Sequence, residues 1–507
     1  MKPSWGRRLW MVPLAGLTVA TLLAAGLAWS QSPSALTWPA SIVPIAAFVS
    51  HDRGLAFLHP VPVHFQSPRT FDRQTAAQDQ PDGATQKAQV LLQAAEFRAL
   101  GLLGGSVNLV EAQTALDTGS VLAYYDDVKK DIVIRGASLS PGTKVTLAHE
   151  LTHVLQDQHF NLVKLDDESS TADEEFAITA IEEGDAVLTE NDYAASLPVR
   201  EQREANAEEN APVTVGGTGT GAGTGTASTG PTGNADFLGI SSEVPYILGP
   251  DFVLLLYNMG GVGMTNRAFE HPPSSELDIV NPSAYLLHQV TRVLPPPALG
   301  RGERRIGSPG SFGAFETYMT LAGDMDATTA LAAADGWGGG SMMQYRSDGS
   351  SCTRLDLVGR TAPQSDALAR AFAVWAGALR QRDVVALVAR RGETTTVSAC
   401  DPGTVATAGP RSREHALDVV DERNANMASA YLYADLPPAV ALCVGDRSVG
   451  DAALLLAEAA QNNSSGAPPK SVQTTIDSQM RDLIGSCRLG SAAAGHGVHV
   501  AAPQPRP

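Results

Sequence analysis

Alternating and helical patterns of apolar residues divide the first 140 residues into short elements. The stretch 54–65 alternates well enough to predict a strand, and an Ala- and Gln-rich segment over 85–102 predicts a helix. Two β-rich runs, 121–125 and 131–135, flank the polar residues 126–130, which predicts a β-hairpin. A short sheet should therefore precede the next helix.

That helix is predicted to begin at Pro141. Ser140 is a favourable N-cap, and proline suits the first helical position. At about 100° per residue, His149 and His153 lie about 40° apart and one turn apart along the axis. An apolar set occupies roughly the opposite side of the helix: Leu147, Leu151, Val154 and Leu155. One helix can thus pack against a core while its two imidazoles face a cleft.

The second half of the chain changes repeatedly in composition. Residues 213–234 are almost all Gly, Thr, Ala and Ser, which cannot bury enough apolar surface to fold, so we expect a flexible insertion. The elements expected after it are a helix around 252–259, a glycine-rich turn at 336–340, strand-like runs at 342–345 and 353–358, a helix over 365–380, and a mostly helical segment over 413–488.

The first 30 residues have the pattern of an export segment. Lys2, Arg7 and Arg8 precede an uncharged, mostly apolar run over 9–29. A cleaved signal has an apolar region of roughly 7–15 residues, whereas this run reaches about 20, the length of a membrane-spanning helix. We therefore expect an uncleaved anchor in the cell membrane, with the rest of the chain outside. A cleaved signal and a secreted protein are the alternative.

Charge and cysteine content narrow the function. The chain has 36 Lys and Arg against 54 Asp and Glu, a net charge of −18, so nucleic acid is not an expected partner. Its four cysteines lie in the last third and lack the short spacing of a thiolate metal site, which agrees with export. We expect the pairs Cys352 with Cys400 and Cys443 with Cys487, because each bond then closes a local unit.

The segment 149–153 carries candidate chemistry. His149-Glu150-Leu-Thr-His153 has the pattern H-E-x-x-H, in which two imidazoles bind zinc and the glutamate takes a proton from the bound water. With 11 histidines in 507 residues, such a match arises by chance in about one chain of this size in a hundred. The expected cofactor is therefore Zn²⁺.

A catalytic zinc needs a third protein ligand, and the residues leave several candidates. A second predicted helix could bring Glu183, or the adjacent Glu182, beside the first. His159 is the rival, ten residues after His149, where a returning chain can supply a third histidine. That turn normally requires glycine three residues before it, because φ there is positive, and this sequence has Gln156. Glu183 is favoured, with Glu182 and His159 as alternatives.

These residues resemble the zincin metallopeptidases that have a glutamate as third ligand. More narrowly, the run 147–160 together with Glu183-Gly-Asp-Ala186 is similar to largely uncharacterised actinobacterial envelope proteins labelled as zinc metallopeptidases. The resemblance extends over about 54–401, and only its zinc motif is specific. It implies that His149, His153 and Glu183 hold the metal and that Glu150 acts as base and then as proton donor.

The resemblance also implies features around the metal. Zincins commonly bind an extended peptide along an edge strand, which here would be 131–135. Asp157 and Asp185 are candidates to orient an imidazole. No residue matches the family's transition-state donor, for which the candidates are Tyr193, Tyr246, His271 and His288.

The expected fold is α+β: a zincin-like catalytic domain with an active-site helix and a short upstream sheet, plus a mainly helical, disulfide-bearing C-terminal region. The expected boundaries are 1–30 for the anchor or signal, 31–300 for the catalytic domain with a flexible insertion over 201–235, 301–410 for a mixed α/β extension, 411–490 for the helical region, and 491–507 for a disordered tail.

The expected function is hydrolysis of peptide bonds in an envelope or extracellular protein. Two alternatives stay open. One is a catalytically inactive, zinc-stabilised binding or scaffold protein of the envelope, and the other is a hydrolase of a non-protein amide such as a peptidoglycan cross-link.

Overall fold

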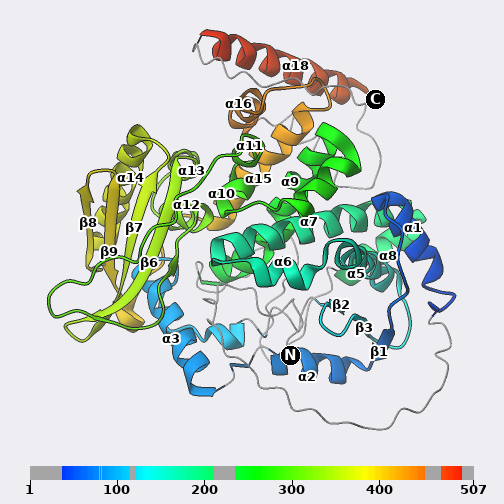
Figure 1. Ribbon diagram of the computed structural model, residues 1–507, viewed down its shortest axis with the longest axis horizontal. Coiled ribbons are helices and arrows are strands. Elements are labelled where there is room, and N and C mark those ends of the chain that lie inside the picture. Colours follow the sequence, from blue (N-terminus) through cyan, green and yellow to red (C-terminus); the bar gives the residue numbers. More distant parts are fainter. Residues whose placement is uncertain are drawn as a thin grey trace.

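The computed structural model describes residues 37–78, 80–81, 83–112, 114, 121–209, 234–450 and 470–493. The fold class is α+β, as the sequence predicts, with two separate sheets and helices around and between them (Figure 1). The predicted anchor (1–30) lies outside the described residues. So do residues 210–233 of the predicted insertion and residues 494–507 of the predicted tail.

The smaller sheet has three strands in the order β1-β3-β2, with β1 parallel and β2 antiparallel to the central β3. The predicted hairpin is confirmed by the pairing of β2 with β3. The prediction that 131–135 is an edge strand is wrong, because β1 pairs with its other side. The elements of this part are α1 (Val43–Arg53), β1 (Val63–Gln66), α2 (Pro68–Gln78), α3 (Gly83–Ala99), β2 (Ala123–Asp126) and β3 (Asp131–Arg135).

Helix α5 (Pro141–Phe160) begins where the sequence predicts. The Ser140 side chain accepts a hydrogen bond from the backbone N–H of Thr143. The helix ends where Asn161 takes a left-handed conformation with φ 59°. Three more helices follow: α6 (Leu162–Glu168), α7 (Ala172–Ser196) and α8 (Val199–Glu209). Residues 201–209, the start of the predicted insertion, are therefore helical.

Helix α9 (Asn234–Glu270) is much longer than the helix predicted over 252–259. It contains Pro245 and Pro250, and its backbone leaves helical geometry at Gly260 and Gly261, so two helices meet at a kink. Prolines disfavour a helix interior, so a helix through both positions is not what local propensity predicts.

The apolar composition of α9 reflects its place in the core. Within the described residues, Phe237–Glu270 is the one helix long and apolar enough to cross a membrane. Side chains from it nevertheless form part of the main hydrophobic core, among them Phe237, Val244, Leu248 and Phe252. Burial against neighbouring helices therefore accounts for its hydropathy.

The larger sheet contains β4-β6-β7-β9-β8 in that order, with β5 paired to β6. Its strands are β4 (Arg304–Arg305), β5 (Gly310–Ser311), β6 (Trp337–Ser347), β7 (Ser350–Gly359), β8 (Ala386–Arg391) and β9 (Thr394–Cys400). The predicted turn at 336–340 is wrong, since β6 begins at Trp337. These glycines allow close backbone approach instead: a Cβ on Gly340 would lie 2.2 Å from the carbonyl oxygen of Phe312.

Helices surround the larger sheet and form the C-terminal part of the chain (Figure 1). Their bounds are α10 (Glu276–Val280), α11 (Pro282–Leu286), α12 (Ala314–Ala322), α13 (Ala327–Ala334), α14 (Ala362–Gln381), α15 (Arg413–Ala430), α16 (Pro438–Ser448) and α18 (Lys470–Ala493), with a 3₁₀ turn η1 (Gly403–Val405). The predicted helix over 365–380 is confirmed, and so is the mostly helical segment over 413–488 for its described residues 413–450 and 470–488.

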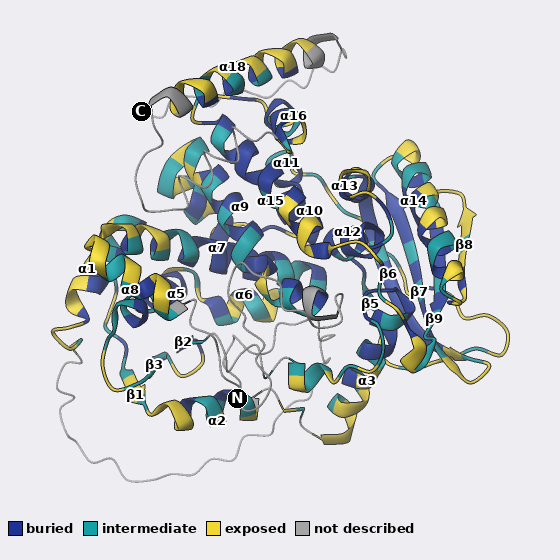
Figure 2. Cartoon of the chain, turned by 180° about the vertical axis from the view of Figure 1, so that it is seen from behind, coloured by how far each residue is buried: buried dark blue, intermediate teal, exposed yellow. Residues whose placement is uncertain are grey.

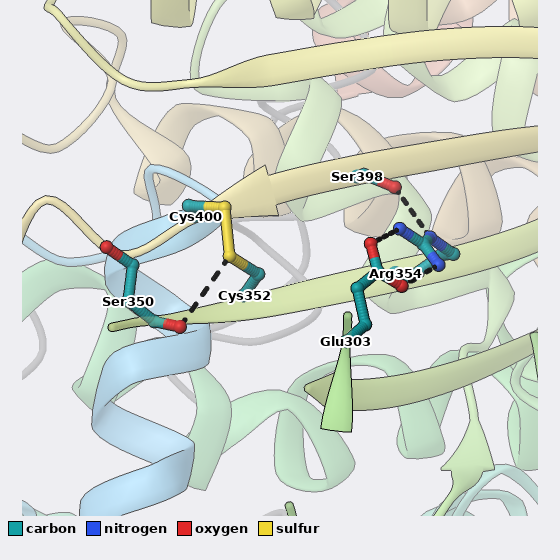
Figure 3. The surroundings of a disulfide bond; sticks show 6 residues. All are labelled: Glu303, Ser350, Cys352, Arg354, Ser398 and Cys400. Carbon is teal, nitrogen blue, oxygen red and sulfur yellow. Dashed lines mark hydrogen bonds and ion pairs between the residues drawn. A yellow bond between two sulfur atoms is a disulfide. The ribbon is translucent and has the colours of Figure 1, made fainter. Parts of the chain in front are cut away.

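Both predicted disulfides are present. Cys352 and Cys400 are directly paired residues on β7 and β9, with Cα atoms 3.9 Å apart (Figure 3). On the same sheet, Arg354 donates to both carboxylate oxygens of Glu303 and to the Ser398 hydroxyl (Figure 3). Cys443 and Cys487 join α16 to α18. The two bonds indicate an oxidising, extracytoplasmic compartment.

Two hydrophobic clusters organise the protein, and buried positions run through the interior of both parts (Figure 2). The larger cluster is continuous from Phe97 on α3 to Cys487 on α18, so it joins residues of the predicted segments 31–300, 301–410 and 411–490. The smaller cluster joins α1, the three-stranded sheet and α5. It holds the helix that carries the H-E-x-x-H motif.

Candidate metal site

The residues of the H-E-x-x-H motif on helix α5 are buried in the interior of the protein. Leu147, Leu151 and Val154 are fully buried in the smaller cluster, which fixes the helix against the three-stranded sheet. His149 and His153 are 3% and 4% exposed and lie on the side that faces α7. The amphipathic pattern in the sequence therefore places both imidazoles at the crossing of two helices.

The run Glu183-Gly184-Asp185 on α7 supplies three separate functions at this crossing. Glu183 points to the two histidines. Gly184 lets α7 touch α9, since a Cβ there would lie 2.2 Å from the backbone carbon of Gly249. Asp185 accepts a hydrogen bond from the Gln156 side chain and pairs with Arg53 of α1. One short motif thus holds a candidate ligand, a helix contact and a positioning group.

Three acceptor atoms converge at the crossing. The Nε2 atoms of His149 and His153 are 3.0 Å apart, and each lies 3.2 Å from Glu183 Oε2. Four-coordinate zinc with donors about 2.0–2.1 Å away spaces neighbouring donors by about 3.3–3.4 Å. The nearly equilateral triangle of this protein is therefore close to the size that a tetrahedral metal requires. These three residues could hold a metal ion.

The hydrogen bonds on the far side of each ring fix where its proton lies. His149 Nδ1 is 2.9 Å from Glu190 Oε2, and a carboxylate only accepts, so Nδ1–H donates. His153 Nδ1 is 2.9 Å from Gln156 Oε1. The orientation of that amide is set by its Nε2, which donates to the Glu182 carbonyl oxygen and to the Asp185 carboxylate, both at 2.9 Å. His153 Nδ1 must therefore be a donor too.

With a proton on each Nδ1 and none on Nε2, both imidazoles would turn an acceptor nitrogen towards Glu183. Three acceptors within 3.2 Å of one another repel unless a cation lies among them. When no metal is bound, a proton on His149 can take the place of the cation. Burial lowers the pKa of this imidazole, but its hydrogen bonds with Glu183 and Glu190 outweigh burial and raise the pKa well above its ordinary value. Burial raises the pKa of the Glu183 carboxyl, but both imidazoles outweigh it and hold that pKa well below its usual range.

Glu150 lies beside the triangle and is fully buried. Its Oε2 accepts a hydrogen bond of 2.8 Å from the backbone N–H of Tyr125 on β2. Its Oε1 is buried without a hydrogen-bond partner in the described part of the chain. Burial raises the pKa of this carboxyl to about 7, although the charges of His149 and His153 act against the rise. A carboxyl with such a pKa is suited to take up and release a proton near neutral pH.

The rival third ligands lie elsewhere. His159 is exposed, and its Nε2 lies 2.8 Å from the carbonyl oxygen of Ala56. Glu182 is buried one position before Glu183 and is not a member of the triangle, although its backbone carbonyl binds Gln156. The metal-compatible group in the described residues is therefore His149, His153 and Glu183.

Of the two aspartates considered as positioning residues, Asp185 reaches His153 through Gln156, whereas Asp157 binds Lys130 and the Tyr125 hydroxyl. Sequence reasoning missed Gln156 in this role, although it lies three residues after His153 on the same helix.

Two further groups were not found from the sequence. Glu190 lies seven residues after Glu183, two turns along the same face of α7, so helical spacing could have indicated it. Arg53 had no such signal, because its contact with Asp185 spans 132 residues. Its guanidinium is only 5% exposed, and it neutralises the buried carboxylate that orients Gln156.

The four candidate transition-state donors are separated by the fold. Tyr246 of α9 lies with its ring nearly parallel to that of His149, the ring centroids being 6.1 Å apart. Tyr193 packs against Phe48 in the smaller cluster. His271 and His288 line a different cavity.

No protein-family model, curated protein or solved structure matches the chain. What the structure itself shows is a buried group of two histidines and one glutamate with the geometry and donor set of a metal site.

Proposed function

We propose that this protein is an extracytoplasmic zinc metallopeptidase that hydrolyses peptide bonds. The observation that carries the proposal is the triangle of three acceptors with fixed histidine tautomers, next to a buried Glu150 oxygen that has no hydrogen-bond partner in the described residues. Two imidazoles and one carboxylate form the protein donor set of a catalytic zinc, and a glutamate next to the first histidine is its general base.

In this proposal His149, His153 and Glu183 hold the metal. Bound zinc would polarise a water molecule and lower its pKa to about 7. Glu150 Oε1 would take up a proton as general base and return it to the leaving amine, while Oε2 stays anchored by the Tyr125 N–H. Tyr246 is the candidate to stabilise the developing negative charge.

The proposed location is the outer side of the cell membrane, with the segment 1–30 as a single-pass anchor, or the exterior if that segment is cleaved. Two disulfides support an extracytoplasmic domain. The proposed substrate is a protein or peptide of the envelope or the surroundings.

The burial of the site favours one alternative. His149, His153 and Glu183 are at most 7% exposed, a degree of burial also suited to a metal that only stabilises the fold. The second candidate is therefore a zinc-stabilised scaffold without catalysis.

Metal analysis tests the ligand assignment. We expect one equivalent of zinc in the purified ectodomain, lost in His149→Ala and in Glu183→Gln. His159→Ala is the matched control and should keep its zinc, because this exposed histidine bonds to the Ala56 carbonyl oxygen and is not a member of the triangle. Full zinc in Glu183→Gln would contradict the proposed third ligand.

Turnover separates the enzyme from the scaffold. Zinc-loaded wild type should cleave denatured casein, and Glu150→Gln should keep the zinc and lose activity by about 100-fold or more. Glu204→Gln on the exposed side of α8 is the control for loss of a carboxylate. A fully zinc-loaded wild type that cleaves neither casein nor purified sacculi would support the scaffold, and cleavage of sacculi alone would point to a peptidoglycan amide.

A further inference from the structure

A large cavity lies away from the metal triangle. A cavity of 740 Å³ is bounded by α3, the N-terminal turn of α7, the segment 288–296 and the start of β6. Glu174 at its edge precedes Glu183 by nine residues, or about 14 Å along α7. The volume is in the range of small-molecule pockets, about 300–1,000 Å³.

Much of the cavity wall is apolar. The side chains come from α3, from α11 and the segment after it, and from the first half of β6, so the cavity lies against the larger sheet. They are Leu92, Phe97, Tyr285, Val290, Val293, Leu294, Pro296, Trp337 and Met342. Val290 and Val293 are 86% and 92% exposed, so apolar surface is present at the edge of the cavity.

The polar part of the wall contains five carboxylates among neutral polar side chains, together with His271, His288 and one arginine. Its carboxylates are Glu96, Asp173, Glu174, Asp278 and Glu316. The one Lys or Arg among the described lining residues is Arg292, which donates to Glu393 and to the Gly359 carbonyl oxygen. Arg292 is therefore paired with groups other than the carboxylates of the cavity.

Three carboxylates of the wall have neutral hydrogen-bond donors. Glu96, 7% exposed, accepts from the Gln344 amide at 2.8 Å. Asp173, also 7% exposed, accepts from the backbone N–H of Glu276 at 2.8 Å. Glu316 accepts from the backbone N–H of Gly313 at 2.6 Å. Each is held in place by a donor that carries no charge.

The electrostatics of this wall favour a positive ligand. Burial raises the pKa of Glu96 and of Asp173 to about 7. Burial, followed by the charges of Glu276 and Glu96, raises the pKa of Glu316 well above its ordinary value. An ammonium or guanidinium group at the wall would offset both the burial and the mutual repulsion of these carboxylates.

The acidic wall does not have the arrangement of a metal site. Within the described residues, the group of His, Cys, Asp and Glu whose ligand atoms lie within 4.8 Å of one another is His149, His153 and Glu183. Calcium needs about six to eight oxygens at 2.3–2.6 Å, which the cavity carboxylates, spread over four elements, do not provide. A cation with an apolar body fits this wall better than a bare ion.

We propose that this cavity binds an organic cation, an amine or guanidinium on an apolar body, with its charge at Glu96 and Glu316 and its body against Phe97, Trp337 and Met342. The site is independent of the proposed metal chemistry and needs no zinc. The bound cation forms ion pairs with the carboxylates. A carboxyl group that was protonated in the free protein releases its proton to the solvent on binding.

Calorimetry with the full chain tests this proposal. The probe is 4-phenylbutylamine, and its neutral counterpart is 4-phenylbutan-1-ol. We expect the amine to bind at least about tenfold more tightly than the alcohol, because a charged hydrogen bond replaces a neutral one. The heat of amine binding should depend on the ionisation enthalpy of the buffer, which reports the released protons.

Variants separate the acidic wall from the apolar one. Glu96→Gln and Glu316→Gln should each weaken amine binding about tenfold and leave alcohol binding unchanged, and Gln at position 96 can still accept from Gln344. Glu204→Gln on α8 is the matched control. Equal affinity for amine and alcohol, no binding of the amine at millimolar concentration, unchanged amine binding in both variants, or displacement of the amine by millimolar CaCl₂ would each overturn the proposal.

Discussion

Replacing Gln156 by leucine should weaken zinc binding without touching a ligand. Gln156 is 1% exposed and uses its whole amide: Oε1 accepts from His153 Nδ1, and Nε2 donates to the Glu182 carbonyl oxygen and to Asp185. Leucine is apolar and one carbon shorter, and it makes none of these bonds. His153 is then free to rotate and to place its proton on Nε2, the atom that faces the triangle.

The expected magnitude follows from the role of Gln156 as an orienting group. Loss of a residue that fixes a metal-bound imidazole typically lowers metal affinity about 10- to 100-fold, or about 1.4–2.7 kcal/mol. The substitution also leaves the Asp185 carboxylate with one donor fewer, so a loss of stability of about 1–3 kcal/mol is expected with it. Because Arg53 still pairs with Asp185, the crossing of α5 and α7 should persist.

Competition with a chromophoric chelator measures the zinc affinity, and urea unfolding of the zinc-free protein measures the stability separately. Gln158→Leu is the matched control: it is on the same helix, two residues further, and bonds to Leu58 and His59 rather than to the triangle. Wild-type zinc affinity in Gln156→Leu would refute the reasoning, since the His153 tautomer would then be set by something other than this amide.

Three further predictions concern the packing, the charge and the cross-links of the fold. Gly184→Ala should destabilise the protein by about 1–3 kcal/mol and weaken zinc binding, because its Cβ would lie 2.2 Å from the α9 backbone, whereas Gly239→Ala, with no atom within 4 Å, should be neutral or stabilising in thermal unfolding. Between pH 4.5 and about 7 folded Glu96 keeps a proton that the unfolded chain has lost, so the free energy of unfolding should fall as pH rises through this window. Glu96→Gln should remove about 3 kcal/mol of that fall, and an unchanged pH slope in urea titrations would contradict the raised pKa. Replacing Cys443 and Cys487 together by alanine opens a link over 44 residues and should cost up to about 4 kcal/mol, measured by calorimetry against the wild type under the same conditions.

Local elements of this protein could be predicted because their signals lie within a few residues of one another. The start of α5 follows from Ser140 and Pro141, and the hairpin follows from two β-rich runs around a polar turn. Neighbour pairing of the cysteines also held, because each bond closes a unit of 44 or 48 residues. Predictions failed where the signal depended on a distant partner. The glycines at 338–340 were interpreted as a turn, but they allow close contact of β6 with chain segments far along the sequence.

The same division applies to the candidate site. The sequence by itself determined that His149 and His153 share one face of a capped helix beside Glu150, because helical geometry depends only on spacing along the chain. Only the tertiary structure decided which acid completes the group and which nitrogen of each ring is free. Glu183 lies 34 residues after His149 in the sequence, and Gly184 next to it lets α7 lie against α9. The tautomer of each imidazole is set by hydrogen bonds that depend on the crossing of α5 and α7. Such contacts arise from packing over long sequence distances, which no local pattern of residues encodes.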